Sequence, residues 1–192
     1  MIRAVLFDFY GVICSDEYWY KVRELGSLNG SEPHIKALSQ DVNLGLISWS
    51  DYCRQVAQDL GKTEAEIENN YAKYRLNRQV IAQISSLKEQ GIIVALASNA
   101  HHDQLQVIFA ENGLDNLFDH LYISSELGVA KPSPAFFEHI ISDLKISPSE
   151  MVMVDDLEPN INAAAKLGLR TVLFRSENQL AETLAHLLST AE

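Results

Sequence analysis

The sequence lacks several features that mark particular classes of protein. Its two cysteines, Cys14 and Cys53, lie in no Cys-x-x-Cys or Cys/His pattern, which excludes a disulfide framework and a zinc site. No apolar run approaches the roughly 20 residues of a membrane-spanning helix. The first residues contain no basic region followed by an apolar stretch of signal-peptide length. We therefore expect a cytoplasmic protein with no membrane partner.

Positive charge is also scarce. The 192 residues include 15 Lys and Arg against 26 Asp and Glu, a formal net charge of -11, without a cluster of basic residues. This balance disfavours binding to nucleic acid or to anionic membranes, because both require positive charge on the protein. It still allows a small anionic substrate, since the local charge of a site can oppose the net charge.

Short apolar runs alternate with helical patterns along most of the chain. Amphipathic segments such as Gln79–Gln90, which Gly91 follows, predict helices. The apolar runs predict strands that are buried on both faces, as in a parallel sheet. These runs are Ile2–Asp8, Ile92–Ser98, His120–Ser124, Met151–Asp155 and Thr171–Phe174. The alternation predicts an α/β fold with a doubly wound parallel sheet.

One long segment interrupts this alternation. Between Cys14 and Arg78 the apolar residues follow helical spacing, and Thr63 with Glu66 has the spacing of a capping box. The segment is too long for a simple crossover between two strands. We therefore predict an α/β core formed by residues 1–13 and 79–192, and a small helical cap over the strand ends formed by residues 14–78.

Polar residues follow four of the predicted strands or their loops, at the edge where ligands bind in such sheets. They are Asp8 in FDFYGV, Ser98 with Asn99 in LASNA, Lys131 in VAKPSP, and Asp155 with Asp156 in VMVDDLEPN. Each one alone is more often a turn or cap residue, or solvent-exposed. Together at one edge, they would repel or leave charges unpaired unless they shared a purpose.

In this order and spacing, the four motifs resemble those of the haloacid dehalogenase superfamily, in the branch whose helical cap follows the first strand. The resemblance spans nearly the whole chain. It implies a Rossmann-like core and a hydrolase with Asp8 as nucleophile and Lys131 as the residue that neutralises charge. It also implies that Ser98 and the main-chain N–H of Asn99 hold a phosphate oxygen, because a transferring phosphoryl group needs such stabilisation.

The same resemblance implies Mg²⁺ as a cofactor and a small phosphorylated molecule as the substrate. Asp8, Asp156 and the main-chain carbonyl of Tyr10 would give three hard oxygen ligands. Asp155 would be an outer or water-mediated partner of the metal, and Asn160 would orient Asp156 from the second shell.

Tyr10 departs from the pattern of the family's phosphatases, which normally have an aspartate at this place as general acid and base. A tyrosine, with a reference pKa of about 10, does not take over the activation of water near neutral pH. Three hypotheses follow: a slow or selective Mg²⁺-dependent phosphatase, a metal-free 2-haloacid dehalogenase, and a non-catalytic module that binds a phosphorylated ligand or a protein. Dehalogenases resemble this chain in having tyrosine here.

The acidic pair Asp155 and Asp156 favours the phosphatase, because dehalogenases have uncharged Ser or Asn in that motif. Val12 also stands where dehalogenases have threonine. Without a metal, the two carboxylates would raise the pKa of Asp8 and weaken it as a nucleophile. The sequence carries no signal for the physiological substrate or for the oligomeric state.

Overall fold

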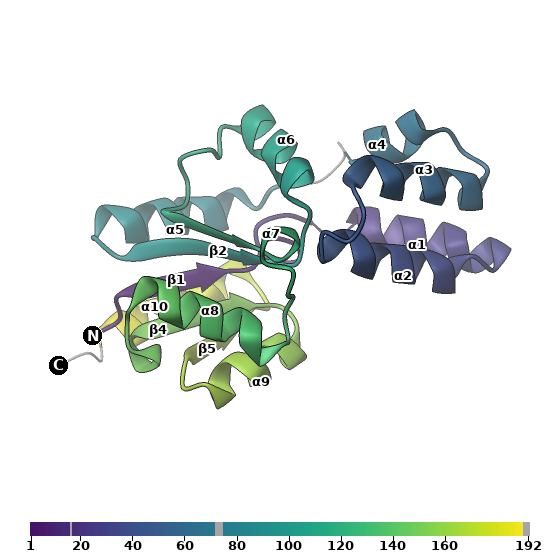
Figure 1. Cartoon of the computed structure of the whole chain (residues 1–192). Coiled ribbons are helices and arrows are strands. Elements are labelled where there is room, and N and C mark those ends of the chain that lie inside the picture. Colours follow the sequence, from purple (N-terminus) through teal and green to yellow (C-terminus); the bar gives the residue numbers. More distant parts are fainter. Residues whose placement is uncertain (16, 72–74, 190–192) are drawn as a thin grey trace.

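The computed structural model describes residues 1–15, 17–71 and 75–189. Five parallel strands in this part form one sheet in the order β3-β2-β1-β4-β5 (Figure 1). They are β1 (Ala4–Phe7), β2 (Ile93–Ser98), β3 (His120–Ile123), β4 (Met151–Asp155) and β5 (Arg170–Leu173). The five apolar runs thus predict the strands correctly, with small differences at their ends, and the doubly wound α/β class is confirmed.

Helices cover both faces of this sheet. They are α5 (Arg78–Glu89), α6 (His102–Asn112) and α10 (Glu177–Ser189) on one face, and α8 (Pro134–Leu144) and α9 (Glu158–Lys166) on the other. Two shorter helices, α7 (Ser124–Leu127) and the 3₁₀-helix η1 (Pro148–Glu150), lie in the connections. Successive side chains of β1 point to opposite faces, so each face receives alternate residues. Because both faces are covered, every residue of β1 is buried.

The position of β1 in the middle of the sheet brings separate parts of the sequence together. It pairs with β2 on one side and β4 on the other, and Phe7 is in register with Leu96 and Val154. The carboxyl ends of parallel strands lie at one edge, so the residues that follow β1, β2 and β4 meet there. Ligands of open α/β sheets bind at this edge.

Four helices form a second part of the molecule, the helical lobe. They are α1 (Glu17–Asn29), α2 (Glu32–Asn43), α3 (Trp49–Leu60) and α4 (Glu64–Tyr71), and they lie beyond the carboxyl ends of the strands (Figure 1). At the start of α4, the Glu66 N–H donates to Thr63 Oγ1 (3.2 Å) and the Thr63 N–H donates to Glu66 Oε2 (2.8 Å). This pair of bonds is the capping box that the sequence predicts.

Two chain segments that lie side by side connect the helical lobe to the sheet. The Ser15 N–H donates to the Arg75 carbonyl (2.8 Å), and the Asn77 N–H donates to the Ile13 carbonyl (2.8 Å). The cap boundaries at residues 14 and 78 fall at these paired segments and stay a prediction. Residues 16 and 72–74 of that range lie outside the described residues.

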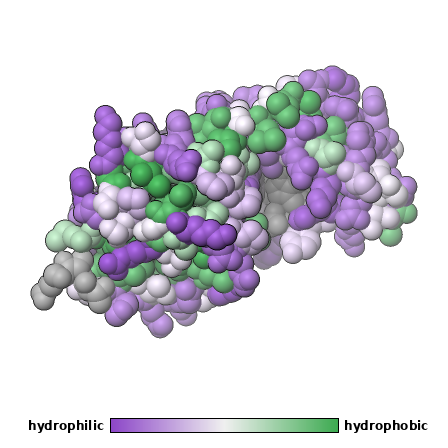
Figure 2. Space-filling view, turned by 60° about the horizontal axis from the view of Figure 1, so that its bottom comes forward, coloured by the Kyte–Doolittle hydropathy of each residue, from purple (hydrophilic) through white to green (hydrophobic). Residues whose placement is uncertain are grey.

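None of the helices in the described residues combines the length and the apolar character needed to cross a lipid bilayer. Large exposed apolar side chains are distributed over several elements, such as Leu28 on α1, Val107 on α6 and Leu121 on β3. On the face shown in Figure 2, hydrophilic residues are spread over both parts of the molecule. Scattered apolar residues of this kind are normal on protein surfaces.

The chain that follows α2 docks on α7, a helix that the sequence does not predict because the apolar run continues to Ser124. The Ser124 hydroxyl donates to the Asn43 carbonyl (2.5 Å) and accepts from the Ala100 N–H (3.0 Å). Gly45 lies against the next residue: a Cβ at this glycine would be 2.4 Å from the Ser125 carbonyl oxygen. Glycine is therefore required where the helical lobe meets the sheet.

We predict that Gly45→Ala destabilises the protein more than Gly30→Ala. Both glycines have a positive φ, +69° and +81°, but a Cβ at Gly30 meets nothing within 4 Å. The control variant therefore measures the backbone cost alone, about 1 kcal/mol. The clash at Gly45 adds roughly 1–3 kcal/mol, as overpacking does. Urea unfolding of both variants tests this difference, and equal losses would show that the contact with α7 is not close.

Candidate active site

Asp8 directly follows β1, so its carboxylate lies at the carboxyl edge of the sheet. The residue is 6% exposed. Its Oδ1 accepts from the Phe9 N–H (2.7 Å) and contacts the ammonium of Lys131 (2.9 Å). These two donors hold the carboxylate in one orientation, which is what a nucleophile at a fixed place requires.

Lys131 joins the ends of two strands. Its buried ammonium contacts Asp8 Oδ1 and also donates to Asp155 Oδ2 (2.7 Å). The side chain of Asn99 holds the main chain of Lys131 from both sides: its Nδ2 donates to the Lys131 carbonyl (2.8 Å), and its Oδ1 accepts from the Lys131 N–H (2.8 Å). Sequence reasoning assigned Asn99 only a main-chain role and missed this clamp.

Asp155 is fully buried, and hydrogen bonds to its carboxylate fix the orientation of the side chain. Besides Lys131, its carboxylate accepts from the Leu157 N–H (2.9 Å) and from Asn160 Nδ2, which is 3.0 Å from each oxygen. The expectation that Asn160 orients Asp156 is therefore corrected: Asn160 lies in the first turn of α9 and binds Asp155. A carboxylate with this many donors is well placed to organise its neighbours rather than to change partners.

Asp156 has a more open environment. It is partly buried, and its carboxylate is packed against the main chain of Gly11, where a Cβ would be 2.4 Å from Oδ2 and 2.8 Å from Oδ1. Gly11 has φ +83°, a backbone conformation that glycine adopts readily. The loop after β1 thus leaves space for a carboxylate from the loop after β4. One oxygen from each of Asp8, Asp155 and Asp156 lies within 4.8 Å of the others.

Burial and neighbouring charges shift the pKa values of Asp8, Lys131 and Asp156. Burial raises the pKa of Asp8 to about 8, with Asp155 and Asp156 adding to the rise and Lys131 opposing it. Burial and the Asp155 charge also raise the pKa of Asp156. Burial alone would lower the pKa of Lys131, but Asp8 and Asp155 outweigh it, and the net shift is upward. Lys131 is therefore a cation, and Asp8, with a pKa of about 8, needs a further positive charge to ionise fully at neutral pH.

Ser98, the last residue of β2, is fully buried, and its hydroxyl has no hydrogen-bond partner among the described residues. Burying an unpaired hydroxyl costs roughly 1–3 kcal/mol, so such a group invites an explanation. A phosphate oxygen is a suitable partner for it. Ser98 is not among the residues that line the pocket described next, whereas its neighbour Asn99 is.

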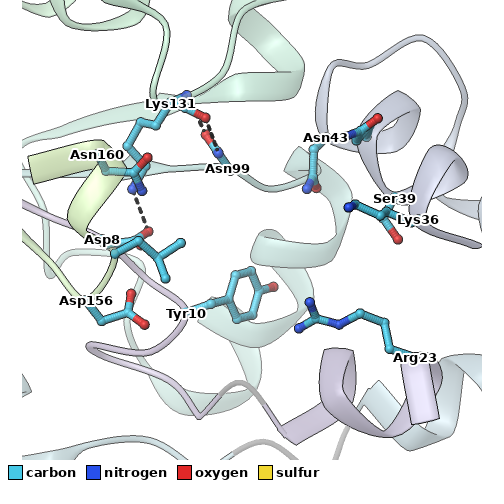
Figure 3. A pocket seen from close by; sticks show the side chains of 12 residues that line it. Asp8, Tyr10, Arg23, Lys36, Ser39, Asn43, Asn99, Lys131, Asp156 and Asn160 are labelled. Atoms are coloured by element: carbon cyan, nitrogen blue, oxygen red, sulfur yellow. Dashed lines mark hydrogen bonds and ion pairs between the residues drawn. The ribbon is translucent and has the colours of Figure 1, made fainter. Parts of the chain in front are cut away.

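A pocket of about 260 Å³ opens between the sheet edge and the helical lobe (Figure 3). The sheet part contributes Asp8, Tyr10, Asn99, Lys131, Asp156, Leu157 and Asn160, and the helical lobe contributes Arg23, Lys36, Ser39, Gln40 and Asn43. Six of the eight residues predicted from the motifs therefore line one pocket, and Asp155 lies buried behind it. Sequence reasoning missed all five residues of the helical lobe. The polar spacing of the four that lie on α2 was the available signal.

The acidic residues fit a divalent cation that binds oxygen. Mg²⁺ prefers carboxylate and carbonyl oxygens and keeps several waters, which suits a site with two ionisable carboxylates at the wall of an open pocket. In Figure 3, Asp156 lies on the other side of Asp8 from the Lys131 ammonium, so the lysine does not fill the space between the two aspartates. The metal ligands named from the sequence, including the Tyr10 carbonyl, stay a prediction.

Comparison with known proteins identifies the family of this chain. The family model of haloacid dehalogenase-like hydrolases matches residues 2–168. D-ribitol-5-phosphate phosphatase from Bacteroides thetaiotaomicron is 27% identical over 199 residues, which cover 93% of each chain. (S)-2-haloacid dehalogenase 2 from a Pseudomonas species is 28% identical over 216 residues, covering 98% of this chain and 92% of the dehalogenase. Some other curated relatives are longer: the match covers 18% of drimenol cyclase drtB from Aspergillus calidoustus and 19% of bifunctional epoxide hydrolase 2 from Rattus norvegicus.

The fold is also shared with solved structures. One is a HAD-family enzyme from B. thetaiotaomicron, crystallised in complex with magnesium and inorganic phosphate. It superposes with a TM-score of 0.77 over 91% of this chain and 95% of the other, at 22% identity. At this level of identity the likeness establishes the fold alone. The relatives include both a phosphatase and a dehalogenase, so the reaction must be argued from the site.

We predict that Lys131→Met lowers the free energy of unfolding by about 3–5 kcal/mol, because it leaves two buried carboxylates without their cation. In this variant the folded-state pKa of Asp8 rises further because Lys131 no longer opposes the rise, so the folded state holds more protons than the unfolded state. Its stability then falls as pH rises, and the loss is larger at pH 8 than at pH 5. Urea unfolding in EDTA at the two pH values measures both effects.

The matched control is Lys88→Met, which removes a surface ion pair with Asp119 (2.9 Å). An exposed pair contributes at most about 1 kcal/mol, so this variant should lose little. Adding Asp155→Asn to Lys131→Met removes one of the unpaired charges and should restore part of the stability. Equal losses in the two lysine variants would contradict a buried role for Lys131.

Proposed function

This chain belongs to the haloacid dehalogenase-like hydrolases, and within that family we propose that it is a phosphatase of a small phosphorylated metabolite. One observation carries the choice: Asp8, Asp155 and Asp156 come within 4.8 Å of one another, and a single ammonium is buried between two of them. A divalent cation balances this excess negative charge. Transfer of a phosphoryl group to a carboxylate requires such a cation, because both reactants are anions.

In the proposed reaction, a carboxylate oxygen of Asp8 attacks phosphorus and the bond from phosphorus to the leaving oxygen breaks. Water then attacks phosphorus, the bond to the Asp8 oxygen breaks, and inorganic phosphate is released with the carboxylate restored. Lys131 offsets the charge on Asp8 and on a phosphoryl oxygen. Ser98, whose hydroxyl has no hydrogen-bond partner in the described part of the chain, and the N–H of Asn99 hold the other phosphoryl oxygens.

We also propose that the cation is Mg²⁺, held by Asp8, Asp156 and the main-chain carbonyl of Tyr10. When bound, it supplies positive charge that stabilises the transferring phosphoryl group. Asp155, fixed by Asn160, anchors Lys131 and so sets the distance between the ammonium and Asp8. The family enzyme crystallised with magnesium and phosphate supports this assignment.

The position of Tyr10 limits the leaving group. Its side chain lines the pocket, and its ring contacts Phe9 with 5.1 Å between ring centroids. An acid at this position typically contributes about 10²- to 10⁴-fold to catalysis. Without it, the leaving oxygen must take its proton from water, so a stable leaving anion such as that of an aryl, acyl or sugar 1-phosphate is favoured.

A second candidate is a 2-haloacid dehalogenase, which Tyr10 and the Pseudomonas relative favour. Halide leaves without a proton, so the lack of an acid would do no harm there. The argument against it is electrostatic: without a metal, Asp8 has a pKa of about 8 and is largely protonated at neutral pH. A third candidate, a binding module without turnover, also leaves the arrangement of Asp8, Lys131 and Asp156 unexplained.

We predict phosphate release from an aryl phosphate that stops when EDTA is added, and no halide release from 2-chloropropionate. Asp8→Asn should abolish the phosphate release while the protein stays folded, as circular dichroism would show. Halide release that resists EDTA would overturn the phosphatase in favour of the dehalogenase. No turnover of either substrate would favour the binding module.

Tyr10→Asp tests the account of the missing acid. If the position only lacks proton transfer, an aspartate there should raise kcat for an alkyl phosphate by about 10²-fold, the lower end of general acid catalysis. The effect on an aryl phosphate should be much smaller, since that leaving group needs no acid. Tyr10→Asn is the control, because asparagine has nearly the same shape as aspartate but does not act as an acid or a base. Equal rates in the two variants would contradict the proposal.

A further inference from the structure

One face of α2 forms the wall of the pocket opposite the sheet. Lys36, Ser39, Gln40 and Asn43 all line the pocket, and they are spaced three and four residues apart, as residues on one side of a helix are. The opposite side of α2 is apolar, with Ile35, Leu38 and Val42 buried in the helical lobe. The polar face of α2 is therefore directed at the site, and packing of the lobe fixes that orientation.

This wall carries positive charge. Lys36 comes from α2 and Arg23 from α1, and both line the pocket. The Arg23 guanidinium lies over the ring of Tyr20, 5.3 Å from its centroid. The two carboxylates that line the pocket, Asp8 and Asp156, both come from the sheet part. Two cations thus face a site in a chain whose formal net charge is -11.

These cations lie away from the place of chemistry. In Figure 3 the Tyr10 ring lies between the Asp8 carboxylate and the Arg23 guanidinium, with its hydroxyl toward Arg23. Lys36 and Asn43 also lie across the pocket from Asp8 in that view. A phosphoryl group must contact Asp8 to react. Arg23 and Lys36 are consequently placed for the far end of the substrate, beyond the leaving oxygen.

The size of the pocket limits what that far end can be. Pockets for drug-sized ligands have volumes of roughly 300–1,000 Å³, and this one has about 260 Å³. A small molecule that spans it brings its second end close to Arg23 and Lys36. An anionic end gains charge-assisted hydrogen bonds there, and Ser39, Gln40 and Asn43 supply neutral hydrogen-bonding groups for a polar middle.

We propose that this face of the helical lobe, with Arg23 and Lys36, selects small phosphate monoesters that carry a second anionic group, a carboxylate or a second phosphate. The inference rests on the proposed phosphatase function. It also accounts for Ser39, Gln40 and Asn43, since they would bind hydroxyl groups between the two anionic ends. Substrates with an uncharged or apolar far end form no ion pair with Arg23 or Lys36 and bind more weakly.

The experiment compares matched phosphate esters. The first pair is 3-phosphoglycerate and glycerol 3-phosphate, in which a carboxylate is replaced by a hydroxymethyl group. The second pair is propane-1,3-diol bisphosphate and 3-hydroxypropyl phosphate, in which the second phosphate is replaced by a hydroxyl group. In at least one pair, we expect kcat/KM to be about ten- to hundred-fold higher for the member that carries the second anionic group, which is the gain typical of charge-assisted hydrogen bonds. The pair that shows the preference identifies the second anionic group as a carboxylate or a phosphate. The preference should shrink as salt is added, because salt screens exposed charges.

Arg23→Gln and Lys36→Gln should each lower this preference about ten-fold. Lys21→Gln removes the same charge from an exposed position of α1 outside the pocket and should keep the wild-type ratio. Equal kcat/KM within both pairs, in an enzyme that hydrolyses aryl phosphate through Asp8, would overturn the anionic subsite and leave the phosphatase intact. A preference that survives both substitutions would overturn it as well. No phosphatase turnover at all would overturn both proposals.

Discussion

The buried ammonium of Lys131, shared by Asp8 and Asp155, ties together the ends of two strands and the loop before α8. Two like charges of this kind repel strongly in a buried place, and a cation between them turns repulsion into attraction on both sides. The arrangement depends on Asn99, which fixes the main chain of Lys131, and on Asn160, which fixes Asp155. One hydrogen-bond network therefore fixes both the positions of Asp8, Lys131 and Asp155 and the pairing of their charges.

The sheet order makes this network possible. Since β1 lies between β2 and β4 in parallel register, the residue after each of these strands reaches the same edge. The network uses one carboxylate from β1 and one from the end of β4, while β2 is followed by the asparagine clamp. The remaining aspartate, Asp156, fits only because Gly11 has no side chain. A buried ion triad and an accessible carboxylate can then coexist a few ångströms apart.

Much of this could be predicted from the sequence, and the limits have physical causes. Strands buried on both faces are apolar throughout, so Ile2–Asp8 and Met151–Asp155 were visible as runs, and the residues after them followed from the topology. The partners of polar side chains were not visible. Asn160 follows Asp155 by five residues and Asp156 by four, and only the turn between β4 and α9 decides which one it binds.

The helical lobe shows the same limit on a larger scale. Helical spacing predicts that α2 has a buried face, but the orientation of its polar face depends on how α1 and α3 pack around it. The docking of the end of α2 and the chain after it on α7 was also hidden, because it depends on the bond from the Ser124 hydroxyl to the Asn43 carbonyl and on the close approach of Gly45 to the Ser125 main chain. Local patterns determine elements and strand ends, whereas contacts between distant segments require the assembled fold.

The sheet wall of the pocket carries negative charge and the lobe wall carries positive charge, so the two walls suit different parts of a substrate. The sheet wall has Asp8 and Asp156, with the Lys131 ammonium beside Asp8, and with Asp155 buried behind the wall, which suits a metal and a phosphoryl group; the lobe wall has Arg23 and Lys36. In Figure 3 the Tyr10 ring lies between Asp8 and Arg23. A residue that does not transfer protons is acceptable there if the leaving group is stabilised in another way. In the proposed binding mode Arg23 and Lys36 lie beyond the leaving oxygen, so they would select the far end of the substrate, and the departure of the leaving group would depend on its own stability as an anion.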